Sequence, residues 1–337
     1  MENVSTFSVP GAALEISVVI CAYTDKRWGD LVAAIESVKR QTVLPKEIIV
    51  VIDHNRELLE RAKTSITGIV ALENEQQQGL SGARNTGIAA AQGDVIAFLD
   101  DDAVAELDWL EHLRNGYKDN VLGVGGPIQP MWLEGRPRWF PEEFDWVVGC
   151  TFRGLPETTS VVGKLIGCNM SFRRAVFDVL GGFRSDMGRV GTHPLAGEET
   201  EFSIRACQRW PDKVLLYEPQ ARVHHRVPAI RANFSYFRTR CYCEGLSKAA
   251  VSRLVGTQDG LASERTYTFQ TLPLGMLRGV GSIVSQRDPM GVARAGMIAA
   301  GLFITIAGYA QSLTSEKLST LKKARFRGPL TREDPVL

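Results

Sequence analysis

The sequence predicts an α/β fold built on a mostly parallel sheet, and three observations support this. Four short apolar runs rich in β-branched residues alternate with segments of helical pattern, as in a succession of βαβ units. Each run is continuously apolar, which is typical of strands that are buried on both faces. Polar residues follow several of the runs directly, at the edge where ligands bind in such sheets.

The elements of the first half follow one another in a regular order. The first two strands read ISVVICA and EIIVVI, and Asp30 offers an N-cap to the helix between them. Glycine at position 93 closes the last helix before the fourth strand. We predict strands at 16–22, 47–52, 69–72 and 95–99, and helices at 31–40, 56–64 and 81–91.

The second half is less regular. Residues 127–160 hold five prolines among aromatic side chains and predict a long functional loop. Short strands are predicted at 214–217 and 221–225, and a helix at 233–253. Residues 295–315 carry no charge and are followed by a basic cluster at 317–327. We expect this stretch to associate with a membrane, lying on it or spanning it, and a buried amphipathic helix is the alternative.

The composition narrows the class of protein. Over 337 residues, 44% are hydrophobic and 23% charged, which is typical of a globular protein. A net charge of +1 argues against a nucleic-acid partner. Six cysteines without a CxxC pair indicate free thiols in a reducing compartment. The start of the chain lacks the pattern of a signal peptide, so we expect a cytoplasmic location.

Three consecutive aspartates, Asp100, Asp101 and Asp102, end the fourth predicted strand. Strand alternation places Asp100 and Asp102 on one side and Asp101 on the other. Two neighbouring carboxylates favour a bound cation, and oxygen ligands suit Mg²⁺ or Mn²⁺. Such a metal can neutralise a departing diphosphate. An acidic turn that caps the next helix is the alternative.

His225 lies in the segment ARVHHRV, where alternation turns it inward together with Val223. His224 shares the other face with two arginines and is expected to meet water. An inward histidine is often a core residue. It becomes a candidate metal ligand if the fold brings it beside the aspartates.

Three glutamates open a predicted helix in the segment GEETE. Acidic residues in a first helical turn stabilise the helix dipole, which accounts for Glu198 and Glu201. Glu199 is rotated away from these two, and a carboxylate at the front of a helix can serve as a general base.

The segment GLSGARNTG, residues 79–87, begins another predicted helix. It matches neither the GxGxxG pattern nor a P-loop. Small residues and Arg84 at a helix start suit a diphosphate. Close packing of this helix on the sheet through Gly82 and Gly87 is the alternative.

Taken in order, these motifs resemble the family-two glycosyltransferases, whose fold is called GT-A. The resemblance covers roughly residues 16–225 and rests on VVICAYTDKR, GLSGARNTGIAAAQGDVIAFLDDDA, GCNMSFRR, GGF and GEETEFSIR. Further on, VHHRV and YFRTRCYCEGLSKA resemble a subgroup that builds surface glycans. That subgroup includes glucuronosyltransferases that act on a lipid-linked glucose.

The resemblance implies a role for each matching residue. Asp102 would bind the metal directly, His225 would be a further ligand, and Asp100 would meet the ribose or the metal's water shell. Glu199 would be the catalytic base, although the family usually has Asp there and Glu is one methylene longer. The remaining substrate contacts would be Ala22 and Tyr23 to the nucleobase, Asp53 to the base edge, Arg84 to the base or diphosphate, and Asn169 and Arg173 to the acceptor or donor sugar.

The resemblance also implies how the chain is organised. We expect a loose leader at 1–14 and a GT-A catalytic domain at 15–255. This domain would join a Rossmann-like nucleotide-sugar half, 15–127, to an acceptor half, 128–255. A C-terminal helical region at 256–337 would then lie at the membrane.

The expected function is that of an inverting, metal-dependent glycosyltransferase. It would use a nucleotide-diphosphate sugar, UDP-linked by our expectation, and Mn²⁺ or Mg²⁺. The acceptor would be a glycan or a polyprenyl-linked sugar at the cytoplasmic face of the cell membrane, for surface polysaccharide or glycoconjugate synthesis. Arg136, Arg138 and Arg173 could pair with a carboxylated donor such as a glucuronic acid nucleotide.

Two other classes of protein stay open. A metal-dependent nucleotidyltransferase also sets carboxylates on an α/β sheet, but its glycine-rich loop with a following lysine is absent after the first strand. A catalytically inactive glycan-binding homologue is the other class. The intact set of Asp100, Asp102, Glu199 and His225 argues against it.

Overall fold

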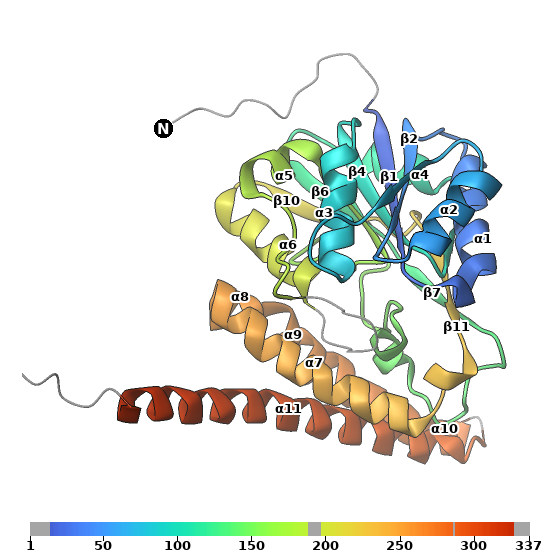
Figure 1. Ribbon diagram of the computed structural model, residues 1–337. Coiled ribbons are helices and arrows are strands. Elements are labelled where there is room, and N and C mark those ends of the chain that lie inside the picture. Colours follow the sequence, from blue (N-terminus) through green and yellow to red (C-terminus); the bar gives the residue numbers. More distant parts are fainter. Residues whose placement is uncertain (1–13, 188–196, 286, 327–337) are drawn as a thin grey trace, which may run out of the picture.

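A mixed sheet of eight strands forms the centre of the protein, in the order β3-β2-β1-β4-β9-β6-β10-β8 (Figure 1). The computed structural model describes residues 14–187, 197–285 and 287–326. The four neighbouring strands β3, β2, β1 and β4 run parallel to one another. Strand β9 runs antiparallel to both of its neighbours, β4 and β6. The strands are β1 (Ile16–Ala22), β2 (Glu47–Ile52), β3 (Val70–Glu73), β4 (Val95–Asp100), β6 (Val121–Gly125), β8 (Ser160–Val162), β9 (Asn169–Arg173) and β10 (Val214–Tyr217).

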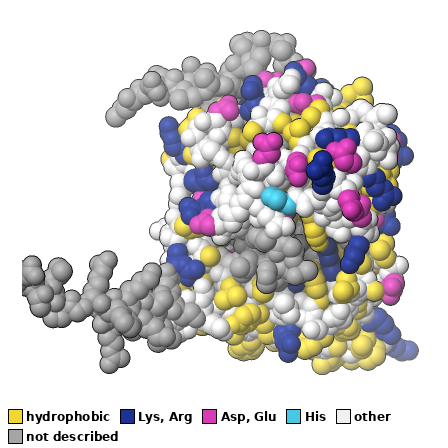
Figure 2. Space-filling model, in the orientation of Figure 1, with side chains coloured by type: hydrophobic (Ala, Val, Ile, Leu, Met, Phe, Trp, Pro, Cys, Tyr) yellow, Lys and Arg dark blue, Asp and Glu magenta, His cyan; other side chains and the backbone are white. Residues whose placement is uncertain are grey.

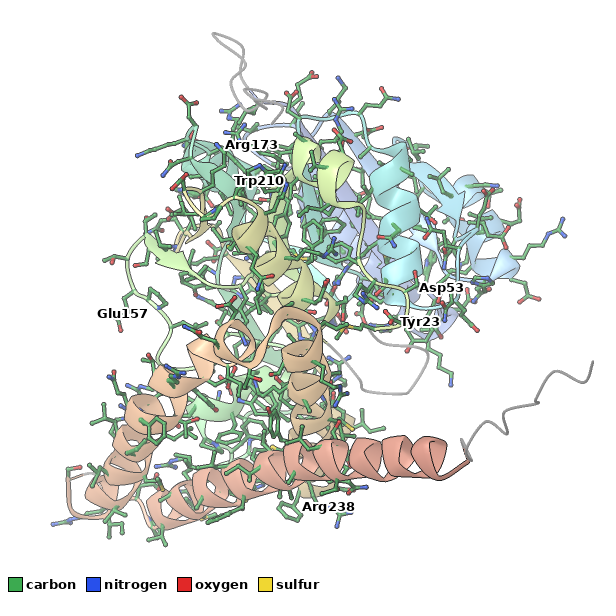
Figure 3. The ribbon with its side chains drawn as sticks, turned by 90° about the vertical axis from the view of Figure 1, so that its left-hand side faces the viewer. Tyr23, Asp53, Glu157, Arg173, Trp210 and Arg238 are labelled. Atoms are coloured by element: carbon green, nitrogen blue, oxygen red, sulfur yellow. The ribbon has the colours of Figure 1, made fainter. Side chains whose placement is uncertain are left out.

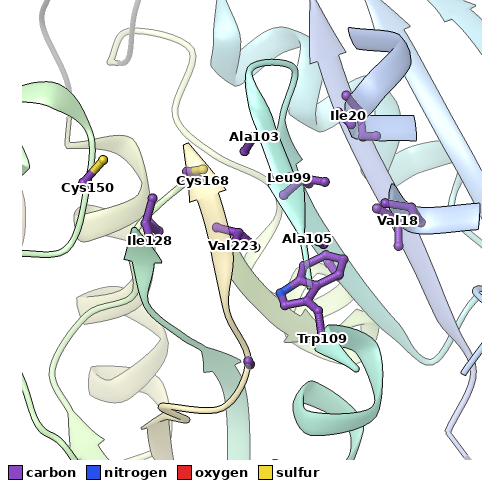
Figure 4. Close-up of a cluster of buried hydrophobic side chains, with 14 of the residues drawn as sticks. Val18, Ile20, Leu99, Ala103, Ala105, Trp109, Ile128, Cys150, Cys168 and Val223 are labelled. Atoms are coloured by element: carbon purple, nitrogen blue, oxygen red, sulfur yellow. The ribbon is translucent and has the colours of Figure 1, made fainter. Parts of the chain in front are cut away.

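Helices cover both faces of this sheet, so the predicted α/β class is confirmed. Alternation along β1 sends Val18 and Ile20 into one hydrophobic cluster and Val19 into the other. Figure 4 shows part of the first cluster, where Leu99 and Trp109 lie near Val18 and Ile20. The first face carries α1 (Trp28–Lys39), α2 (Arg56–Ser65) and α4 (Trp109–Gly116), and the second carries α3 (Leu80–Ala90), α5 (Arg174–Leu180) and α6 (Glu198–Arg209).

A small second sheet positions the end of β4. It pairs β5 (Ala103–Ala105) and β7 (Ile128–Trp132) on either side of β11 (Val223–Val227). Strand β7 and the 3₁₀ segment η2 (Glu142–Val148) lie where the sequence predicted a loop, so that prediction was wrong for these residues. Pro130 is tolerated inside β7 because this strand lies at the edge of its sheet.

The C-terminal helices form a layer beneath the sheet, which we call the helical platform (Figure 1). Helix α11 crosses α7 at two glycines, since a Cβ atom on Gly245 or Gly308 would lie 2.1 Å from a backbone oxygen of the other helix. The platform contains α7 (Phe234–Val255), α8 (Thr257–Gly260), α9 (Ala262–Thr266), the π-helical turn η4 (Tyr267–Thr271), α10 (Leu272–Ser285) and α11 (Met290–Phe326).

Several predicted boundaries move in the structure. Helix α1 begins at Trp28, after a 3₁₀ turn capped by Thr24, so Asp30 lies inside its first turn and is not its N-cap. Helix α11 is longer than the predicted stretch 295–315 at both ends. Residues 1–13 of the predicted leader and the side chains of the basic cluster 317–327 lie outside the described residues.

Candidate active site

The aspartate triplet turns the chain from one sheet into the other. Strand β4 ends at Asp100, and Asp101 and Asp102 form the turn into β5. Because β5 pairs with β11, His225 is brought to Asp102, with 3.1 Å between Nε2 and a carboxylate oxygen. His225 is buried, as the alternation predicted, and His224 faces outward to Glu106.

Two arginines neutralise the turn. Arg27 lies 2.8 Å from Asp101 and 2.9 Å from Asp102, and Arg231 lies 3.2 Å from Asp102. Burial opposes ionisation of Asp102, but His225, Arg231 and Arg27 outweigh it and hold the pKa of that carboxyl well below its usual range. The prediction that Asp101 faces the other side was wrong. Alternation ends with the strand at Asp100, and Asp101 shares Arg27 with Asp102.

The cluster has the composition of a divalent metal site. Asp100, Asp102 and His225 each offer one ligand atom, and these atoms lie within 4.8 Å of one another. The buried Oδ2 of Asp101 has no hydrogen-bond partner, but Asp101 does not belong to this set of ligand atoms. Two carboxylates and an imidazole fit Mn²⁺ or Mg²⁺.

A buried ion pair lies beside this cluster. Arg84, from the start of α3, lies 2.9 Å from Glu198 and 3.5 Å from Asp100, and its guanidinium also donates to the carbonyl oxygen of Gly167. Arg84 and Glu198 are both almost fully buried. Glu198 therefore neutralises Arg84 at the first turn of α6, and this pair ties α6 to α3.

Glu199 is the next residue of α6, and it is half-buried. Its Oε2 atom has no hydrogen-bond partner, whereas Glu201 is paired with Arg205 at 2.9 Å. Burial, reinforced by the charge of Glu198, raises the pKa of Glu199 to about 8. A carboxyl group with such a pKa is suited to exchange protons near neutral pH.

A cavity of about 660 Å³ joins the end of the sheet to the helical platform. Arg84, Asp100, Glu199 and His225 lie on its catalytic side. The platform supplies much of the remaining lining, including Tyr267, Leu272, Leu302, Ile306 and Tyr309. The platform therefore adds apolar side chains to the lining, together with charged ones from α7 and α9.

Four charged residues of the cavity wall join the platform to the sheet. Lys248 of α7 lies 2.9 Å from Glu244 and 2.7 Å from Glu264, and Lys164 lies 3.2 Å from Glu264. Burial opposes the charge on Lys248, but the two glutamates hold its pKa above the usual range. We call these four residues the lysine–glutamate cluster.

The residues expected at the nucleobase gather at the carboxyl ends of β1 and β2. Tyr23 is 44% exposed and lies near Asp53, as Figure 3 shows. The Asp53 carboxylate accepts hydrogen bonds from Asn74, at 2.6 Å, and from the backbone of Gly79, at 3.0 Å. Ala22 is buried, and its carbonyl oxygen accepts from the backbone of Asp53.

Asn169 lines the cavity, but its side chain is fully engaged within the protein. Its amide nitrogen donates to the carbonyl oxygens of Pro127 and Ala221, and its oxygen accepts from the indole of Trp109 at 2.8 Å. Asn169 therefore fixes the joint between the two sheets.

Arg173 lies at the opposite end of the sheet, which corrects its predicted role as a substrate contact (Figure 3). Strand β9 runs antiparallel to β4, so Asn169 pairs with Leu99 near the site and Arg173 pairs with Val95 at the far end. The Arg173 guanidinium donates to the carbonyl oxygens of Val121 and Lys118.

Arg136 and Arg138, the other arginines considered for a donor carboxylate, are also placed elsewhere. Arg136 is paired with Asp145 at 2.6 Å, and Arg138 with Asp288 at 3.1 Å. Neither arginine lines the catalytic cavity.

Sequence reasoning missed Arg27 and Arg231. Arg27 could have been found, because it follows the first strand on the ligand-binding edge. Arg231 carried no signal. Its position depends on the short turn η3 (Ala229–Arg231) after β11, which returns the chain to Asp102.

The sheet, its aspartate turn and the carboxylate-bearing helix opposite define a glycosyltransferase of the GT-A fold. The structure of "Mannosyltransferase PcManGT from Pyrobaculum calidifontis in complex with GDP-Man and Mn2+" aligns with 88% of this chain and 88% of its own, with a TM-score of 0.54 and 14% identity. This likeness shows the shared fold.

The chain belongs to glycosyl transferase family 2, whose profile matches residues 17–181. A glucosyl-dolichyl phosphate glucuronosyltransferase of Haloferax volcanii is 36% identical over 246 residues, which are 72% of this chain and 78% of that protein. The succinoglycan biosynthesis protein ExoM of Rhizobium meliloti is 25% identical over 247 residues, covering 70% of this chain and 75% of its own length.

Proposed function

We propose that this chain is an inverting, metal-dependent glycosyltransferase that transfers a hexuronic acid from a UDP-linked donor to a lipid-phosphate-linked sugar. The catalytic cavity is the observation that carries this proposal, because the reactive groups lie on its sheet side and the helical platform adds apolar side chains such as Leu302 and Ile306 to the same cavity. The relative named as a glucosyl-dolichyl phosphate glucuronosyltransferase supports glucuronic acid as the donor sugar and a lipid-linked glucose as the acceptor.

The outer surface of the platform supports a membrane-bound acceptor. Hydrophobic side chains gather over the lower part of the molecule, where α10 and α11 lie (Figure 2). Part of α11, Met290–Thr314, is long and apolar enough to cross a membrane, and only 17% of its 18-residue apolar window is buried within the protein. We propose that it lies in the membrane interface at the cytoplasmic face, because one side of it is held against α7 and lines the cavity.

The metal-site residues would support the leaving group. Asp100, Asp102 and His225 would hold Mn²⁺ or Mg²⁺, which supplies Lewis-acid stabilisation of the departing diphosphate when bound. On the donor side, Tyr23 offers an exposed ring to the nucleobase. Asp53 fixes the loop before α3 through Gly79, and Arg84, held by Glu198, faces the diphosphate region.

Glu199 would act on the acceptor. Its carboxylate accepts the proton of the acceptor hydroxyl while that oxygen bonds to C1 of the donor sugar and the bond from C1 to the diphosphate breaks. One such displacement inverts the configuration at C1. Glu199 comes from α6 and the metal-site residues from β4, the following turn and β11, so separate elements serve acceptor and leaving group.

Donor and acceptor specificity test the proposal directly. Purified protein with Mn²⁺, a panel of nucleotide sugars and a glucosyl polyprenyl phosphate in detergent should release UDP from UDP-glucuronic acid. The lipid should gain the mass of one hexuronic acid, with inverted configuration by NMR. In a parallel mixture of a nucleoside triphosphate and a sugar 1-phosphate, release of pyrophosphate would indicate a nucleotidyltransferase. No turnover in either mixture would indicate an inactive homologue.

A matched pair of variants connects this activity to the site. Glu199→Gln should remove transfer, whereas Glu157→Gln should retain it. Glu157 is exposed and lies away from Tyr23 and Asp53 (Figure 3).

A further inference from the structure

A second cavity, of about 760 Å³, lies between η2, the segments that flank it and helices α10 and α11. Its lining is rich in arginine. These arginines come from parts of the chain far apart in sequence, so it is the fold that gathers them. They are Arg136, Arg138, Arg153, Arg278 and Arg294.

The five arginines of this cavity exceed the four carboxylates that pair with them, of which Asp145 holds Arg136. Glu142 is paired with Arg153 at 2.7 Å, and Glu143 with Arg278 at 2.5 Å. Two further arginines share a single carboxylate. Arg138 lies 3.1 Å and Arg294 lies 2.8 Å from Asp288. The Arg138 side chain is 71% exposed, so its guanidinium can also reach an anion from solvent.

The cavity borders the exposed apolar face of α10. Its lining includes Gly281, where a Cβ atom would meet nothing within 4 Å, whereas Gly275 and Gly279 pack against Glu143 and α11. Leu277 and Val280 stand beside these positions on the same helix and are 68% and 54% exposed. An anion in the cavity would therefore have apolar side chains next to it.

We propose that this cavity binds the phosphate headgroup of an anionic membrane lipid, whose acyl chains lie along the exposed face of α10. Guanidinium groups bind phosphate oxygens in pairs, and arginines with apolar neighbours suit the boundary between headgroups and acyl chains. This inference rests on the proposed function for its membrane.

The lipid site lies next to the proposed acceptor site. Segment η2 separates the two cavities, with Glu142 and Glu143 in the arginine-lined cavity and Phe144 and Trp146 in the catalytic cavity. A headgroup bound here sets the position of the catalytic cavity relative to the bilayer.

Vesicle binding by the full-length protein tests the inference. Co-sedimentation is measured with phosphatidylcholine vesicles, with and without phosphatidic acid, for wild type and the double variant R138Q/R153Q. These two side chains are 71% and 54% exposed, so the fold should persist, which thermal unfolding checks. The control R40Q/R56Q makes the same charge change at exposed positions, directly after α1 and at the start of α2.

We expect R138Q/R153Q to bind vesicles with phosphatidic acid about 30-fold more weakly than wild type, and R40Q/R56Q to stay within about 3-fold. Equal losses in the two double variants would show diffuse attraction and overturn the site. So would wild-type binding that is indifferent to phosphatidic acid. Tryptophan fluorescence with inorganic phosphate gives the third arm. If inorganic phosphate saturates the cavity and vesicles with phosphatidic acid do not displace it, the cavity is a site for a free anion instead.

The proposed function is read separately on the same samples. Hydrolysis of the nucleotide sugar with Mn²⁺, measured without vesicles, should be equal in wild type and both double variants. If none of the three proteins hydrolyses the nucleotide sugar, the proposed function is wrong. The vesicle result would then still decide whether the lipid site exists.

Discussion

Three basic side chains of the site converge on Asp102. It is only 4% exposed and contacts Arg27, Arg231 and His225. Removing the whole side chain would leave two half-buried guanidinium groups without this partner and would disturb the turn as well as the chemistry. A substitution that tests the chemistry of Asp102 alone must therefore keep the shape of its side chain.

We expect Asp102→Asn to lower transfer by at least about 100-fold, because an amide binds a divalent cation far more weakly than a carboxylate. Calorimetric titration with Mn²⁺ and turnover on the nucleotide sugar measure the two effects. Asp108→Asn, on a side chain that is 47% exposed, is the control. Near-normal turnover of Asp102→Asn would exclude Asp102 as a metal ligand.

The raised pKa of Glu199 predicts how the rate depends on pH. Below its pKa of about 8 the carboxyl is protonated and cannot accept a proton, so kcat should rise with pH and level off above that value. Glu199→Gln should lower kcat by at least about 100-fold at every pH while donor binding survives.

Glu198→Gln provides the comparison for Glu199. It removes the neighbouring charge that helps to raise the Glu199 pKa, so the rising limb should move to lower pH. A profile that does not change with pH would contradict the assignment of Glu199 as the base. So would loss of transfer in Glu198→Gln alone.

The sequence predicts the position of a single residue only where that residue belongs to a local pattern, such as the alternation within a strand. Alternation within one strand turned His225 inward, and the structure confirms it. The direction of β9 is not encoded in its own five residues, because it depends on which strands flank it. Arg173 was therefore assigned to the wrong end of the sheet.

At the scale of elements, the best predicted strands are those with two buried faces. The bounds of β1 and β2 match the predicted 16–22 and 47–52, because a continuous apolar run has few other places in a fold. Strand β7 was missed because its residues alternate between buried and exposed positions and include Pro130. Its partner β11 lies far along the chain, so no local pattern reveals the pairing.

The crossing of α7 and α11 should depend on Gly308. Any larger residue would place its Cβ 2.1 Å from the carbonyl oxygen of Tyr242 and push α11 away from α7. Gly308→Leu should destabilise the protein by about 1–3 kcal/mol and reduce transfer to the lipid acceptor more than donor hydrolysis.

Gly296→Leu is the control for this crossing, because the Cβ position at Gly296, on the same helix, has nothing within 4 Å. Thermal unfolding and the ratio of transfer to hydrolysis report the two effects. Equal behaviour of the two leucine variants would show that the crossing does not shape the catalytic cavity.

At the scale of the whole molecule, the platform combines two surfaces. Its inner side lines the catalytic cavity, and its outer side exposes Leu277 and Phe303, at 68% and 71%. The same helices would thus meet the bilayer and present the acceptor. Domain bounds at 15–255 and 256–337 remain a prediction, and the cavity lies across that division.

The double variant L277S/F303S should weaken binding to anionic vesicles by at least about 10-fold, because two exposed apolar side chains no longer enter the membrane. Its thermal unfolding should stay near that of wild type. L44S/V179S, at exposed apolar positions remote from the platform, is the control. Unchanged pelleting of L277S/F303S would place the membrane contact elsewhere.

The lysine–glutamate cluster has a consequence for exchanging acceptor specificity between relatives. Lys164 lies in the catalytic sheet region, Lys248 in α7 and Glu264 in α9. Glu264 pairs with both lysines, and Lys248 also pairs with Glu244 of its own helix. A chimera joined at residue 255 would separate Glu264 from both lysines and leave buried charge unbalanced. A chimera joined before α7 that also takes residue 164 from the relative would keep the cluster whole. The transferred part that is most able to carry a new acceptor preference is therefore discontinuous in sequence.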